Sequence, residues 1–111
     1  MDTSIESLQR IIAESVRKVH GVSSLSEGTF SMLKNEFFTP ENQISQGIKI
    51  SKHDELLNID IFVIIKYGMN IPQLSWNIQT KVKKTLEEIG NINIGEINIH
   101  VQGVVHRRKV L

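Results

Sequence analysis

The chain has 111 residues, which is the length of one domain, enough for a single core and too short for a second domain. Its 13 basic and 12 acidic side chains give a formal net charge of +1, so no overall field draws it to nucleic acid or to an anionic membrane. The absence of cysteine excludes disulfides and thiolate metal sites. No apolar stretch approaches the ~20 residues that span a bilayer, and no signal-peptide pattern occurs at the start. We therefore expect a cytoplasmic protein that does not insert directly into the membrane.

The first predicted element is an amphipathic helix. Thr3 and Glu6 have the spacing of a capping box, and the helical pattern ends at Gly21. Between them runs a single apolar stripe: Ile5, Leu8, Ile12, Val16 and Val19. Such a stripe predicts that the helix packs on a sheet.

Residues 22–43 carry a weaker pattern. Their first part is rich in serine and glycine and indicates a loop: Ser23, Ser24, Ser26 and Gly28. Three apolar side chains at helical spacing then predict a short helix before Pro40: Phe30, Leu33 and Phe37.

Two strands, a helix and a third strand follow. Residues 47–50 predict a short strand, and a polar turn at residues 52–55 joins it to a long strand whose odd positions from 57 to 67 are apolar. An apolar period of three and four residues then predicts a helix over residues 71–89, with Pro72 in its first turn and Gly90 at its end. Residues 96–103 alternate again, which predicts a strand with one buried face.

This order predicts an α/β fold of the α+β type, a two-layer sandwich with the helices on one face of a small mixed or antiparallel sheet. We expect one domain over residues 1–111, with a basic C-terminal tail at residues 104–111. The last strand should run parallel to the long strand, because a helix connects the two. We expect it to lie beside the first short strand, where all its neighbours would be antiparallel.

Four residues are candidates for partner binding. Phe62 and Ile64 fall on the sheet face away from the helices, together with His100, and in a two-layer fold that face is exposed. Trp76, the sole tryptophan, falls off the apolar stripe of its helix and could anchor a partner. The alternatives are that residues 22–43 cover Phe62 and Ile64, and that Trp76 packs against a loop of its own chain.

No pattern indicates catalysis, a cofactor or a metal. The four histidines lie in different elements and lack the close spacing of a zinc site: His20, His53, His100 and His106. The neighbouring carboxylates Asp54 and Glu55 fall in a predicted turn, where solvation is the simpler interpretation. The basic clusters are read as solvated side chains, with weak contact to nucleic acid or anionic lipid as the alternative: Lys81, Lys83 and Lys84, and Arg107, Arg108 and Lys109.

Several segments resemble the alkaline shock protein family of Gram-positive bacteria. They are Val16-Arg17-Lys18-Val19-His20-Gly21-Val22, Tyr67-Gly68, Asn77-Ile78-Gln79 and Ile97-Asn98-Ile99-His100-Val101-Gln102-Gly103. The resemblance implies a small cytoplasmic domain without catalytic activity that is linked to envelope stress and works by assembling or binding partners. Relatives usually begin with a short strand before the first helix, which this chain lacks. A bare sheet edge is therefore expected, and with it self-association.

The functional hypothesis is a non-enzymatic scaffold or adaptor of the cell-envelope stress response. It would bind a protein partner anchored in the membrane, or form a homo-oligomer, and would lie at the membrane periphery through that partner. An RNA-binding module of KH-like topology is an alternative, although the chain lacks a Gly-x-x-Gly clamp and nucleic acid is not expected. A further alternative is a small enzyme or the regulatory subunit of one.

Overall fold

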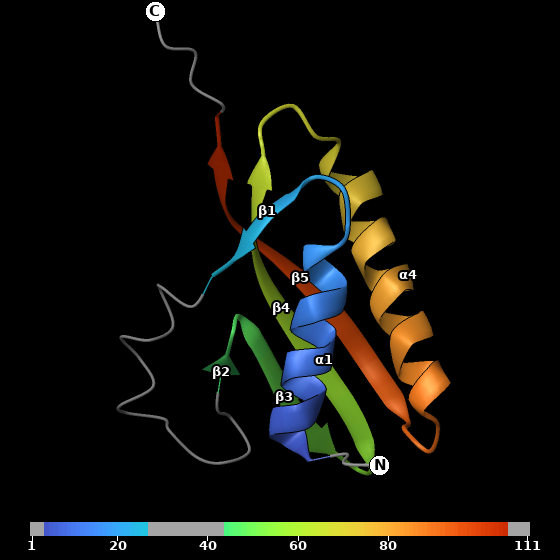
Figure 1. Cartoon of the computed structure of the whole chain (residues 1–111). Coiled ribbons are helices and arrows are strands. Elements are labelled where there is room, and N and C mark those ends of the chain that lie inside the picture. Colours follow the sequence, from blue (N-terminus) through green and yellow to red (C-terminus); the bar gives the residue numbers. More distant parts are fainter. Residues whose placement is uncertain (1–3, 27–43, 107–111) are drawn as a thin grey trace, which may run out of the picture.

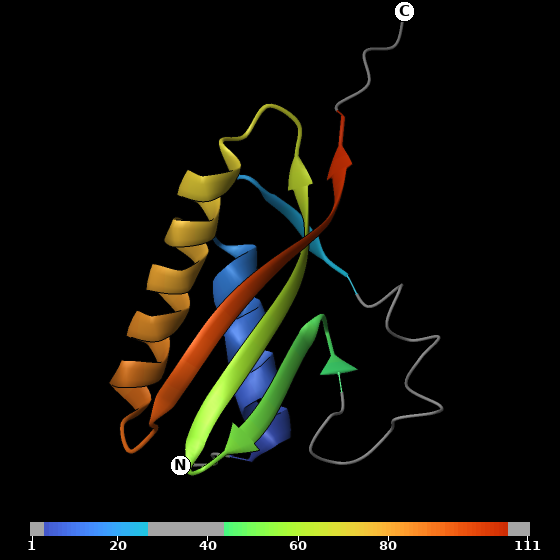
Figure 2. The same ribbon diagram turned by 180° about the vertical axis from the view of Figure 1, so that it is seen from behind.

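The computed structural model describes residues 4–26 and 44–106. Two helices, α1 (Ile5–Arg17) and α4 (Ile71–Ile89), lie side by side on one face of a sheet (Figures 1 and 2). Within the described residues the sheet has five strands: β1 (Val22–Leu25), β2 (Ile44–Ser45), β3 (Ile48–His53), β4 (Leu56–Lys66) and β5 (Ile94–Val105). The predicted two-layer α+β architecture is confirmed. The short helix predicted before Pro40 lies outside the described residues.

Both helices begin at polar caps. Ser4 caps α1 by accepting a hydrogen bond from the Ser7 backbone N–H at 3.2 Å, so the cap lies one residue later than the predicted Thr3. Asn70 caps α4 by accepting from the Gln73 N–H at 2.9 Å, and Gly90 ends it with a φ of 84°. The cap of α1 was misplaced because Thr3 and Ser4 are both good cap formers.

Strand β4 is the centre of the sheet. A two-residue turn at Asp54 and Glu55, both with positive φ, connects β3 to β4 as an antiparallel hairpin. Strand β5 runs parallel to β4 from Leu57 to Lys66, and β1 pairs antiparallel with the end of β4. The predicted parallel orientation of the last strand is confirmed.

Two expectations about the sheet are wrong. The segment read as a serine-rich loop forms β1, because pairing with β4 stabilises four residues that carry little strand signal of their own. Strand β5 lies beside β4 and not beside β3. The reason is that β3 and β1 share one edge of β4 end to end, which leaves the whole opposite edge of β4 to β5. Strand β5 also continues to Val105, two residues into the predicted tail.

The core lies between the helices and the sheet. The predicted stripes supply it, and most of these side chains are fully buried: Leu8, Ile12 and Val16 from α1, Leu74, Ile78, Val82 and Leu86 from α4, and Ile48, Ile50, Ile59, Ile61, Val63 and Ile65 from the strands. Buried Gln9 donates through Nε2 to the carbonyl of Ile48 at 3.0 Å, which ties α1 to β3. Ser15 of α1 donates to Thr85 of α4 at 2.9 Å, which ties the two helices together.

Candidate functional site

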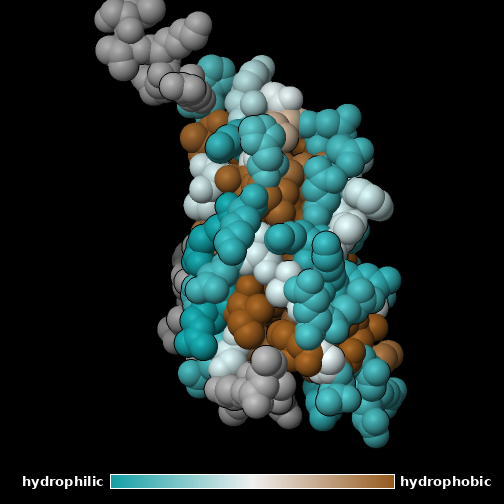
Figure 3. All heavy atoms as spheres, turned by 45° about the vertical axis from the view of Figure 1, so that its right-hand side comes forward, coloured by the Kyte–Doolittle hydropathy of each residue, from teal (hydrophilic) through white to brown (hydrophobic). Residues whose placement is uncertain are grey.

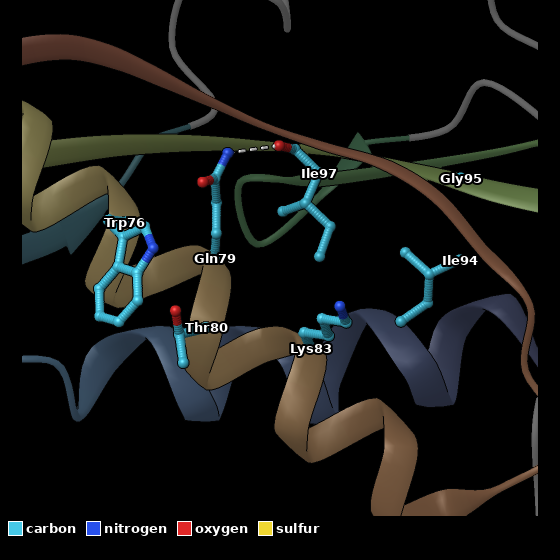
Figure 4. A pocket seen from close by; sticks show the side chains of 7 residues that line it. All are labelled: Trp76, Gln79, Thr80, Lys83, Ile94, Gly95 and Ile97. Carbon is cyan, nitrogen blue, oxygen red and sulfur yellow. Dashed lines mark hydrogen bonds between the residues drawn. The ribbon is translucent and has the colours of Figure 1, made fainter.

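A groove between α4 and β5 is the leading candidate site. It encloses a hollow of about 350 Å³, lined by Trp76, Gln79, Thr80 and Lys83 from α4 and by Ile94, Gly95 and Ile97 from β5. Figure 4 shows the helix side chains on one wall and the β5 residues on the other, with Trp76 at one end and Lys83 closer to Ile94. These seven residues form the α4–β5 groove.

The helical period places Trp76 in this groove. The buried stripe of α4 contains Leu74 and Ile78, and Trp76 between them is rotated away from the core. Trp76 is 60% exposed. Thr80 and Lys83 follow at spacings of four and three residues, so they line the same side of α4.

Gln79 bridges the two walls of the groove. Its Nε2 donates to the carbonyl of Ile97 at 2.8 Å, as the dashed line in Figure 4 indicates. A side chain of α4 thus occupies a backbone acceptor of β5. This contact was not among the residues predicted from the sequence, because it depends on where β5 lies.

The opposite face of the sheet holds a second cluster of polar and aromatic side chains. His100 Nε2 lies 2.9 Å from Asp60 Oδ1, and Asn98 Nδ2 donates to the same oxygen at 3.3 Å. The His100 ring stacks on Phe62 with centroids 4.6 Å apart and an interplanar angle of 22°. The register explains the cluster, because Asp60 pairs with Asn98 and Phe62 pairs with His100.

The expectation that Phe62 stands exposed on this face is wrong, since Phe62 is only 2% exposed. The stacked imidazole of His100 covers part of the ring, and most of the alternative cover, residues 27–43, lies outside the described residues. Ile64 is partly exposed, and His100 is also partly exposed. The structure therefore brings Phe62 and His100 together, whereas Trp76 belongs to the helix layer beyond the sheet.

Two further hollows lie at the ends of the molecule. One of about 500 Å³ is lined by Ser23, Lys66, Tyr67, Val105 and His106, with the rings of Tyr67 and His106 4.4 Å apart. The other, of about 570 Å³, is lined by residues from the start of α1, from the β3–β4 turn and from the segment before β5. Trp76 is not among the residues that line either hollow.

The helix side of the molecule is mostly hydrophilic, with apolar residues in patches between the polar ones (Figure 3). Across residues 4–26 and 44–106, no helix combines the length and the apolar character that crossing a membrane requires. No three His, Asp or Glu side chains in these ranges are grouped as metal ligands would be.

Solved structures with the same fold include MamM CTD. One such structure superposes with a TM-score of 0.59 at 12% identity, covering 89% of this chain and 96% of that one. Another has a TM-score of 0.60 at 12% identity and covers 96% of this chain and 98% of that one. At this level of identity the likeness shows the fold alone.

Sequence relatives include two proteins of Bacillus subtilis (strain 168). The uncharacterized protein YloU is 32% identical over 82 residues, which are 74% of this chain and 63% of YloU. The uncharacterized protein YqhY is 28% identical over 99 residues, which are 89% of this chain and 72% of YqhY. This chain thus spans less than two thirds of the length of YloU.

A family model for alkaline shock protein 23, described as having a cell envelope-related function, matches residues 1–106. The chain belongs to the alkaline shock protein 23 family, a family with a cell envelope-related function.

Proposed function

We propose that the protein is a non-enzymatic adaptor that contributes to the cell-envelope function of its family by binding a protein partner in the α4–β5 groove. The observation that carries this proposal is Trp76, which stands 60% exposed on α4 at the wall of a hollow. Tryptophan is the residue type most enriched among those that dominate binding energy at interfaces. Leaving such a side chain in water is unfavourable unless a partner covers it.

The chemistry of the groove supports docking over catalysis. Its seven lining residues contain one ionisable side chain, Lys83, beside aliphatic groups, an indole, an amide and the hydroxyl of Thr80. An acid, a base and a nucleophile within reach of one another are the usual requirement for a hydrolytic or transfer reaction, and this lining does not supply them. The groove instead combines an aromatic anchor, apolar walls and a few polar groups, which is the composition of a binding site.

The partner that fits a cell envelope-related family is a protein anchored in the membrane. The adaptor would then lie at the membrane periphery through that partner. The RNA-binding alternative receives less support, because Phe62, the aromatic side chain of β4 on the outer sheet face, is buried and cannot stack on a base.

The test is partner capture by the full chain from a detergent-solubilised envelope fraction, quantified by mass spectrometry. Trp76→Ala should lose the captured partner, because the anchor is removed. Tyr67→Ala is the matched control, since Tyr67 is a similarly exposed aromatic residue, at 66%, that lies outside the groove. Equal capture by wild type and Trp76→Ala would contradict the proposal.

A further inference from the structure

The backbone of β5 has an open edge beside the groove. Within residues 4–26 and 44–106, β5 pairs with β4 alone. The Leu57 N–H donates to the carbonyl of Asn93 at 2.8 Å, so Leu57 turns its backbone toward β5, and by alternation so do Ile59, Ile61 and Val63. In a parallel ladder, the β5 residues that pair with these positions direct their own N–H and C=O groups away from β4.

Those outward-facing residues are Ile97, Ile99 and Val101, which pair with Ile59, Ile61 and Val63. The bond from Gln79 to the Ile97 carbonyl agrees with this geometry, because α4 lies on that side of β5. The N–H and C=O groups of Ile99 and Val101 therefore point away from the sheet, next to the end of the groove that holds Trp76.

An open row of alternating donors and acceptors is matched by another extended backbone. Grooves between an edge strand and a helix bind peptides in this way, with backbone hydrogen bonds supplying affinity and pockets for alternate side chains supplying specificity. Both parts are present here: the α4–β5 groove has a hollow with room for a side chain beside Trp76, and the open β5 edge at Ile99 and Val101 continues from its Ile97 wall.

We propose that the partner contributes an extended peptide segment that adds to β5 as a further strand, with an apolar side chain against Trp76 and an acidic residue near Lys83. This inference rests on the proposed function and names the chemistry of the ligand. Among the seven described residues of the groove, Lys83 supplies the only charge, which favours an acidic residue at that end.

Gln79 acts as a removable cap in this arrangement. The incoming strand would need the Ile97 carbonyl that Gln79 now occupies, so binding must break one hydrogen bond inside the protein. Removing the cap should therefore strengthen peptide binding. A partner that simply packs against the side chains of the groove would gain nothing from the same change.

The probe is a set of peptides selected from a random display library on the immobilised full chain. Trp76 is the sole tryptophan, so its fluorescence reports occupancy of the groove. Gln79→Ala should lower the dissociation constant of the peptide about fivefold, which corresponds to the net value of one hydrogen bond. Val101→Pro, which removes an outward N–H, should raise the dissociation constant about tenfold, whereas Val101→Ala should keep most of the affinity.

Amide hydrogen exchange in the wild-type chain keeps the test independent of how well the variants fold. Peptide binding should slow exchange at Ile99 and Val101, and should leave Asn98 and His100, whose amides already face β4, unchanged.

Three results would overturn the inference. They are the failure to select any peptide, a fluorescence change without protection at Ile99 and Val101, and protection that appears without peptide and increases with protein concentration. The last result would identify a second copy as the occupant. The proposed function fails separately, through equal partner capture by Trp76→Ala.

Discussion

The two sides of β4 are built differently. On one side, β3 and β1 meet end to end, and Phe62 joins them, because its N–H donates to the Gly47 carbonyl at 2.9 Å and its carbonyl accepts from the Ser26 N–H at 2.8 Å. Beyond β3 lies β2, a strand of only two residues. On the other side, the twelve-residue strand β5 pairs with β4 alone among the described strands.

The difference matters because long open edges invite pairing with other chains, and proteins usually protect them. The β1–β3 side has a common form of protection, since it ends in a very short strand. The β5 side has partial protection: its register with β4 shifts twice, and Gln79 caps a single carbonyl. On the proposal above, the β1–β3 side contributes to stability and the β5 side to binding. Substitutions on the β1–β3 side should therefore mainly lower the free energy of unfolding, and substitutions on the β5 side should mainly change binding.

The largest expected effect comes from the core that both sides share. Ile61 is fully buried beneath the helices, so Ile61→Ala should lower the free energy of unfolding by about 2–5 kcal/mol. Urea denaturation followed by circular dichroism measures it. A loss below about 1 kcal/mol would mean that the helices and the sheet do not share a packed core at this position.

The β1–β3 side can be probed at the junction of the two strands. Gly47 has a φ of +80°, and a Cβ atom there would lie 2.9 Å from Leu25 Cβ and 3.0 Å from the Phe62 carbonyl oxygen. Gly47→Ala should therefore cost about 2–3 kcal/mol, from backbone strain and crowding together. Gly90→Ala is the matched control, because Gly90 has a φ of +84° and a Cβ atom added there would meet nothing within 4 Å. Equal losses in the two variants would show that the junction is not tightly packed.

The β5 side should respond much less in stability. Gln79→Ala removes one partly exposed hydrogen bond to the β5 edge, so the unfolding free energy should fall by about 1 kcal/mol or less. The same denaturation assay measures this change. A loss as large as that of Gly47→Ala would mean that the Gln79 bond holds the sheet together, in conflict with its role as a cap.

The smallest effect on stability is expected at Trp76. Because the side chain is mostly exposed, Trp76→Ala should change the unfolding free energy by about 0.5 kcal/mol or less, while partner capture is lost. Thermal unfolding of the purified variant checks the first part. A strongly destabilised variant would indicate that Trp76 packs within its own chain, and its loss of capture could then not be attributed to the groove.

Local patterns in the sequence predicted much of the fold. The stripes of α1 and α4 and the alternation in β4 each depend on near neighbours in the chain, so they could be read without knowing the topology. Strand β1 could not, since Ser23 and Ser24 carry no strand signal and the strand exists through pairing with Ile64 and Ile65.

The candidate site was predictable on one wall only. The exposure of Trp76 follows from its angular position on α4, which the sequence determines. The other wall depends on β5 lying next to β4, and the prediction placed that strand beside β3. The burial of Phe62 was missed for a related reason, because the His100 ring that stacks on it comes from β5, next to β4.

The openness of the β5 edge can be tested most directly by amide hydrogen exchange, residue by residue, in the free full chain. Because the Asn98 and His100 amides face β4 while those of Ile99 and Val101 face outward, slow and fast exchange should alternate along the strand. Uniformly slow exchange from Ile97 to Val101 at all protein concentrations would show that the edge is already covered, and would contradict a docking site at this edge.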